Sequence, residues 1–180
     1  MKTEPVAVPL IQYTLLPADP KGHLFDVTLD VSGLPDTALC VSLPAWIPGS
    51  YMIRDFARHI VEIRADDGAR RISLEKLDKH RWRARPRGGR LRLRYRVYAW
   101  DLSVRGAHFD ESHAFFNGTS VFLRVDGHES APCRLRLSPP PHAGDWRVAT
   151  TLARAGARLW GFGDYEARDY DELIDHPVEM

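Results

Sequence analysis

The segment AHFDESHAFFNGTS (residues 107–120) gathers four side chains that can bind a metal ion: His108, Asp110, Glu111 and His113. A zinc-binding helix of the HExxH type places its two histidines four residues apart, so that both lie on one helical face. Here the histidines are five residues apart and no helical pattern surrounds them. The spacing favours a polar loop at the end of a β-sheet domain. The sequence therefore predicts no metal ligand and no catalytic residue in this chain.

Motifs for nucleophilic catalysis and for nucleotide binding are also missing. Ser50 follows a proline and a glycine in a turn, whereas the serine of a GxSxG nucleophile elbow sits between a strand and a helix. The segment WGFGD (residues 160–164) contains two glycines without the lysine of a phosphate-binding loop. Neither segment supports catalysis or nucleotide binding.

Eight arginines between residues 81 and 96 form the strongest charge pattern. They alternate with apolar residues, so Trp82 and Tyr95 point to the opposite side of a sheet from the arginines. A surface for nucleic acid would interleave aromatic and basic side chains on one face. The pattern favours a solvated face, with docking against the seven carboxylates of residues 164–179 as an alternative. The net charge of +1 gives no general attraction to nucleic acid or membranes.

Period-two alternation of apolar and polar residues predicts β-strands along most of the chain. Residues 23–31 show it clearly, and further strands are predicted at residues 38–43, 60–65, 72–77, 121–125, 133–137 and 146–150. Residues 80–100 are predicted to form a hairpin around the turn at residues 86–89. Only residues 168–177 have a helical pattern, with Asp169 as the N-cap. We predict an all-β fold, an antiparallel β-sandwich with a short helical C-terminal tail.

The length of 180 residues and the hydrophobic share of 44% suit one globular domain with its own core. No segment is long and apolar enough to span a membrane, and the N-terminus has no signal-peptide pattern. We expect no membrane partner and favour the cytoplasm, although the compartment is otherwise unknown. Cys40 and Cys133 form no CxxC pair, which predicts buried free thiols, with a disulfide as the alternative.

The segment LPAWIPGSYMIRDFARHI (residues 43–60) is too aromatic for an ordinary loop and too interrupted by proline and glycine for a strand or helix. It resembles a signature in the N-terminal region of the glycyl aminopeptidase family, whose members are zinc metallopeptidases with a PDZ domain. The segments LRYRVYAWDLSVRGAHFDESHAFFNGTSVFL, PPPHAGDWRVATTL and YEARDYDELIDHPVEM agree with that region in order and approximate spacing. The resemblance covers most of the chain from residue 40 onward, and its specific part is the combination of WIPGSYMIRDFARH with NGTSVF.

This resemblance implies a parent enzyme with an N-terminal β-rich domain, a thermolysin-like catalytic domain and a PDZ domain. The family's zinc is held by an HExxH motif and a downstream carboxylate, none of which occurs in this chain. Residues 1–165 are thus expected to form the N-terminal sandwich, and residues 166–180 a linker into an absent catalytic domain. The chain is expected to be inactive alone, with zinc only in the catalytic domain. The expected partners are the catalytic and PDZ domains of the parent and a peptide substrate, with no nucleic acid.

The resemblance also suggests a role for individual residues at the rim of a substrate cleft: Tyr51, Arg54, Asn117, Gly118, Thr119 and Glu179. Trp46 and Phe56 are expected to pack against the catalytic domain. In the alternative interpretation the aromatic residues pack the edge of the sandwich, and Arg54 pairs locally with Asp55. A second alternative for the whole chain is a stand-alone β-sandwich module. It would bind carbohydrate or peptide through the exposed aromatic side chains of segment 43–60.

Overall fold

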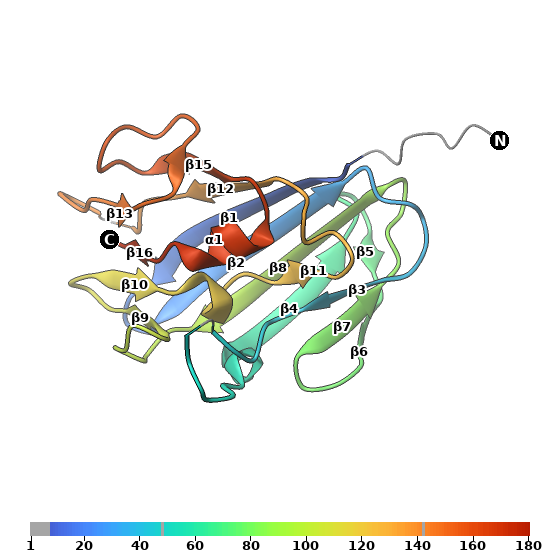
Figure 1. Ribbon diagram of the computed structural model, residues 1–180, viewed down its shortest axis with the longest axis horizontal. Helices are drawn as coiled ribbons and strands as arrows, with labels where there is room; N and C mark the ends of the chain where they lie inside the picture. Colours follow the sequence, from blue (N-terminus) through green and yellow to red (C-terminus); the bar gives the residue numbers. More distant parts are fainter. Residues whose placement is uncertain (1–7, 48, 142) are drawn as a thin grey trace.

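The residues that the computed structural model describes, 8–47, 49–141 and 143–180, form three β-sheets arranged in two layers (Figure 1). The first layer is one eight-stranded sheet, in the order β14 (Ala153–Arg154), β15 (Gly163–Ala167), β12 (Cys133–Leu137), β1 (Leu10–Asp19), β2 (Leu24–Ser32), β8 (Arg90–Tyr98), β4 (Ile60–Asp66) and β5 (Arg71–Ile72). All its pairs are antiparallel except β1 with β12. The predicted all-β fold is confirmed.

The second layer consists of two smaller sheets that lie side by side over one face of the large sheet (Figure 1). One contains, in order, β13 (Ala149–Thr150), β16 (Val178–Glu179), β10 (Ala114–Phe116) and β9 (Ala107–Phe109). The other contains β11 (Arg124–Val125), β3 (Leu39–Ser42), β7 (Arg81–Ala84) and β6 (Leu74–Lys76). Three short helices complete the fold: η1 (Phe56–His59), η2 (Gly118–Ser120) and α1 (Tyr170–Asp175).

The alternation in the sequence determines which face of the large sheet is buried. In β2, Phe25, Val27, Leu29 and Val31 are at most 1% exposed, while the residues between them are partly exposed. In β8 the apolar residues are buried in the same way and the arginines lie on the outer face. The predicted strand at residues 23–31 is confirmed in position and in facing.

Residues 80–100 do not form the predicted hairpin. Strand β7 pairs with β3 and β6 in one small sheet, whereas β8 pairs with β2 and β4 in the large sheet. The turn at residues 86–89 therefore carries the chain from one layer to the other. Trp82 of β7 and the apolar residues of β8 lie in opposite layers. Their side chains still meet in one core, which the two layers enclose.

The arginines of β8 are paired with acidic residues of the neighbouring strands. Arg90 and Arg92 contact Asp30 at 3.2 and 2.7 Å, Arg96 contacts Asp26 at 2.8 Å, and Arg94 contacts Asp66. These acids come from β2 and β4, not from the acidic tail, of which Asp164 pairs with Arg136. The tail is thus not the partner of these arginines.

Three tyrosine hydroxyls join the layers to one short segment, residues 121–123. Tyr13 of β1 donates a hydrogen bond to the carbonyl oxygen of Leu123 at 2.7 Å, Tyr95 of β8 donates to Val121 at 2.9 Å, and Tyr170 of α1 donates to Phe122 at 2.7 Å. All three hydroxyls are buried, so these bonds satisfy backbone oxygens that water does not reach.

The C-terminal residues 166–180, expected to be a linker, are packed into the domain in this structure. Asp169 caps α1 by accepting a hydrogen bond from the backbone N–H of Glu172 at 2.7 Å, which confirms the predicted helix start. Beyond the helix, β16 pairs with both β10 and β13. Leu173 and Val178 are fully buried. A domain boundary at this end of the chain stays a prediction.

Candidate functional site

The segment of residues 43–60, which we call the rim loop, runs from β3 to β4 at one end of the sandwich. Its described part is held by its own backbone and side chains. The backbone N–H of Arg54 donates to the carbonyl oxygen of Ala45 at 2.6 Å, and the Trp46 indole N–H donates to that of Ser50 at 2.5 Å. Gly49 has a φ of +80°, which an L-residue adopts only with strain.

Four large apolar side chains of the rim loop are exposed: Trp46, Tyr51, Met52 and Ile53. Tyr51 is fully exposed at 105%, and Trp46 is 48% exposed. The expectation that Trp46 is available for packing against another surface is therefore compatible with its position. Phe56 is not available in this way, because it is 5% exposed and belongs to the core of this domain.

Arg54 and Asp55 do not pair with each other as the alternative interpretation expected. Asp55 instead lies 2.9 Å from the Lys79 ammonium group. Arg54 is half-buried, and its Nε atom is buried without a hydrogen-bond partner among the described residues. Oδ1 of Asp55 is likewise buried without a hydrogen bond among the described residues, although it lies within ion-pair distance of Lys79.

Residues 117–119 pack against α1 through Gly118. The Asn117 side chain caps η2 by accepting hydrogen bonds from the backbone N–H and the hydroxyl of Thr119, at 3.1 and 2.6 Å. Thr119 is fully buried. A Cβ on Gly118 would lie 2.7 Å from the Cα of Ile174 in α1. Because Gly118 has no side chain, the backbone of this loop lies close to the backbone of α1 in the same domain.

Glu179 lies on β16 with its side chain exposed, opposite Ala149 of β13 and Phe115 of β10. Among the predicted residues, Tyr51, Arg54 and Trp46 share the rim loop, whereas Glu179 and residues 117–119 lie on other elements.

A second apolar loop, residues 99–106, lies between β8 and β9 and was not predicted from the sequence. Trp100, Leu102 and Val104 are all more than half exposed. This loop lies beside the end of the rim loop, because His59, Asp101 and Gly106 line one small crevice. The signal was present in the sequence as AWDLSV, in which Trp100, Leu102 and Val104 continue the period-two apolar pattern beyond the end of the strand.

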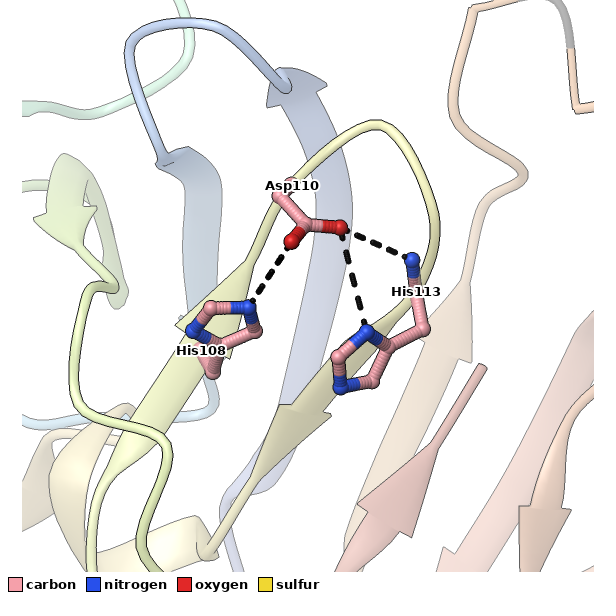
Figure 2. A group of neighbouring side chains, drawn as sticks. All are labelled: His108, Asp110 and His113. Atoms are coloured by element: carbon pink, nitrogen blue, oxygen red, sulfur yellow. Dashed lines mark hydrogen bonds and ion pairs between the residues drawn. The ribbon is translucent and has the colours of Figure 1, made fainter.

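The polar residues His108, Asp110 and His113 come together at the tip of the hairpin formed by β9 and β10 (Figure 2). The Nε2 atom of His108 lies 3.1 Å from Oδ2 of Asp110, and Nδ1 of His113 lies 3.8 Å from Oδ1 of Asp110. Hydrogen bonds from Ser112 hold the pKa of Asp110 well below its usual value. Glu111, the fourth residue of the sequence cluster, is exposed and is not part of this group.

Comparison with known proteins gives the chain a family. Residues 12–180 match the model described as the Peptidase M61 N-terminal domain. The crystal structure of an aminopeptidase N family protein from Idiomarina loihiensis superposes with a TM-score of 0.90 at 40% sequence identity, covering 94% of this chain and 29% of that one. A search of curated proteins found no match.

A more distant structure shares the fold alone. It is a mutant M1 zinc metallopeptidase from Deinococcus radiodurans bound to a Tyr-Ser-Ala substrate, with a TM-score of 0.52 at 15% identity over 95% of this chain and 42% of that one.

The fold and these matches define the class: a β-rich N-terminal domain of a peptidase. The chain belongs to the Peptidase M61 N-terminal domain family. The resemblance noted in residues 43–60 is thereby confirmed. The chain spans less than a third of the length of the Idiomarina loihiensis protein.

Proposed function

We propose that this chain is the non-catalytic N-terminal domain of a zinc aminopeptidase, which packs on the catalytic domain and shapes the cleft that admits short peptides. The observation that carries the proposal is the coverage: 94% of this chain matches 29% of an aminopeptidase N family protein. On this proposal, chemistry resides in the remaining part of the parent, where zinc is bound, and this domain supplies positioning of the peptide. A PDZ domain is the other expected partner within the parent.

The exposed apolar side chains support a docking role for this end of the sandwich. Three consecutive residues of the rim loop, Tyr51 to Ile53, are each more than 60% exposed. The neighbouring 99–106 loop adds three further exposed apolar side chains. A cluster of this kind is typical of a surface that another domain covers. Arg54 adds a half-buried cation to the same loop.

The test uses the parent protein and a triple substitution, Tyr51→Ser, Met52→Ser and Ile53→Ser. In the isolated chain we expect an unchanged melting temperature, because these side chains contact solvent. In the parent we expect kcat/KM for short peptides to fall about tenfold, the effect of about 1.4 kcal/mol of lost interaction.

The matched control is Leu159→Ser, because Leu159 is also an exposed apolar residue on a loop but lies outside the rim loop and the 99–106 loop. It is expected to leave kcat/KM unchanged. Peptide hydrolysis by the isolated 180-residue chain would overturn the non-catalytic role. A parent whose activity is insensitive to the triple substitution would overturn the role of the rim loop. Specific binding of a sugar by the isolated chain would instead favour the binding module.

A further inference from the structure

The geometry of the β9–β10 hairpin places three metal-ligand side chains on one face. Successive side chains of a strand alternate, so His108 and Asp110 share a face. The backbone N–H of Asp110 donates to the carbonyl oxygen of His113 at 3.1 Å, which sets His113 opposite Asp110 across the turn. Figure 2 shows the three side chains converging at this turn. A helix would need the two histidines four residues apart, whereas this hairpin brings together histidines that are five residues apart.

The distances within the cluster are close to those of a coordination sphere. One donor atom from each of the three side chains lies within 4.8 Å of the other two. Oδ2 of Asp110 lies 3.1 Å from Nε2 of His108, and Oδ1 of the same carboxylate lies 3.8 Å from Nδ1 of His113. Ligands at about 2.0–2.2 Å from a tetrahedral ion lie roughly 3.3–3.6 Å from each other. Binding of an ion would draw the three donor atoms from within 4.8 Å of one another to this spacing.

Hydrogen bonds within its own turn fix the orientation of the Asp110 carboxylate. Its Oδ1 atom accepts hydrogen bonds from the backbone N–H of Ser112 at 2.7 Å, the Ser112 hydroxyl at 2.6 Å and the backbone N–H of His113 at 3.1 Å. Its Oδ2 atom contacts only His108 among the described residues. Supporting hydrogen bonds that orient a ligating carboxylate are typical of metal sites.

His108 is a buried imidazole with a nitrogen that the protein does not use. Its side chain is 6% exposed, and Nδ1 has no hydrogen-bond partner among the described residues. The ring is fixed in orientation between Trp100 and His113, each with its ring centroid 4.9 Å away. A neutral imidazole can carry its proton on either nitrogen, so a move of that proton to Nδ1 frees the Nε2 lone pair without net release of a proton.

We propose that His108, Asp110 and His113 bind one divalent transition-metal ion of the Zn²⁺ class at the tip of the β9–β10 hairpin, with water completing the coordination. Two imidazoles and one carboxylate are a ligand set that suits zinc and related borderline ions and not Mg²⁺ or Ca²⁺, which prefer oxygen ligands alone. The ion joins the two strands of the hairpin next to the 99–106 loop. This inference is independent of the proposed docking role.

The test is calorimetric titration of Zn²⁺ into the tag-free, metal-stripped 180-residue chain. We expect one saturable site per chain. His113→Ala is expected to weaken binding at least about tenfold, because it removes a half-exposed ligand without opening the core. The matched control His128→Ala removes a half-buried histidine outside the cluster and is expected to leave the affinity unchanged. Circular dichroism checks that each variant is folded.

Asp110→Asn gives a second, sharper variant. The amide oxygen of asparagine can still accept the three hydrogen bonds of the turn, while the amide nitrogen that replaces Oδ2 cannot bind a metal. Retained folding with lost Zn²⁺ binding supports the site. Absence of saturable binding to the wild-type chain overturns it, as does equal weakening by His128→Ala. A Co²⁺ complex whose absorption shows thiolate ligation would assign the metal to the cysteines and would also overturn it.

Discussion

At the scale of single residues, the two cysteines show how burial separates chemically identical groups. Both are free thiols, which agrees with the favoured prediction, but Cys133 is buried on β12 and Cys40 is half-exposed on β3. Burial raises the pKa of Cys133 to about 12, and the nearby Asp169 adds to the shift. Since the thiolate is the reactive form, the thiol at Cys133 is unreactive at neutral pH.

We therefore expect an alkylating reagent at pH 8 to modify Cys40 and to leave Cys133 unmodified in the folded chain. The thiolate fraction at Cys133 is smaller by about three orders of magnitude than that of an ordinary cysteine. Mass spectrometry of peptides after labelling, with and without denaturant, measures the difference. Equal labelling of both cysteines in the native protein would contradict the expected burial.

At the scale of elements, the close packing of η2 against α1 requires a residue without a side chain at position 118, which is Gly118. The two elements approach so closely that a Cβ at this position would lie 2.7 Å from the Cα of Ile174 and 3.2 Å from the carbonyl oxygen of Leu173. Both contacts are to backbone or buried atoms, which cannot move aside at low cost. The glycine of the NGT segment is thus explained by the packing of α1.

Gly118→Ala is expected to lower the free energy of unfolding by about 1–3 kcal/mol through overpacking. The matched control is Gly156→Ala, whose Cβ would meet no heavy atom closer than 3.8 Å, to Asp164. Urea unfolding of both variants measures the effect. If Gly118→Ala is as stable as Gly156→Ala, the close packing of η2 against α1 does not contribute to stability.

At the scale of the whole molecule, the two layers are joined by buried hydroxyl groups that must stay protonated. Tyr13, Tyr95 and Tyr170 each donate a hydrogen bond to a carbonyl oxygen of residues 121–123. Burial raises the pKa of each phenol above its ordinary value. A phenolate would have no proton to donate and would face a carbonyl oxygen in the core, so ionisation and folding oppose each other.

This arrangement predicts a loss of stability in base. A group whose pKa is raised by folding contributes stability that is fully present below its unfolded pKa, here about 10, and that is lost as the pH rises above that value. Each tyrosine contributes a slope of up to about 1.4 kcal/mol per pH unit above pH 10.

Urea unfolding at pH 8 and at pH 10.5 measures this loss. Tyr13→Phe is expected to reduce it, whereas Tyr51→Phe, at a fully exposed tyrosine, is expected to leave it unchanged. An equal effect of both substitutions would contradict the role of the buried hydroxyl groups.

Several predicted strands are confirmed because their buried faces follow directly from alternation. The long central strand β1 was not predicted, although Ile11, Tyr13 and Leu15 are buried at alternate positions. Pro17 interrupts the usual strand pattern, and the structure accommodates it beside a shift in register between Pro17 and Asp19. The strands predicted at residues 121–125 and 146–150 are reduced to two residues each, Arg124–Val125 and Ala149–Thr150.

The candidate site was predicted in part. The rim loop was selected for its composition, and Trp46, Tyr51 and Arg54 do lie on it. The burial of Phe56 and Thr119 could not be predicted, because it depends on neighbouring loops and on α1, which are distant in sequence. The grouping of His108, Asp110 and His113 depends on the register of β9 with β10, which no local spacing rule gives.

The sequence by itself determined the all-β class, the facing of the alternating strands, the cap of α1 and the family, because each depends on local periodicity or on short motifs. The tertiary structure alone decided that β7 and β8 belong to opposite layers, that the C-terminal residues pack into the core, and which aromatic residues remain exposed. These features arise from contacts between residues far apart in the chain. Such contacts form because the fold as a whole buries apolar surface, and no single segment of the sequence shows which distant segment it will pack against.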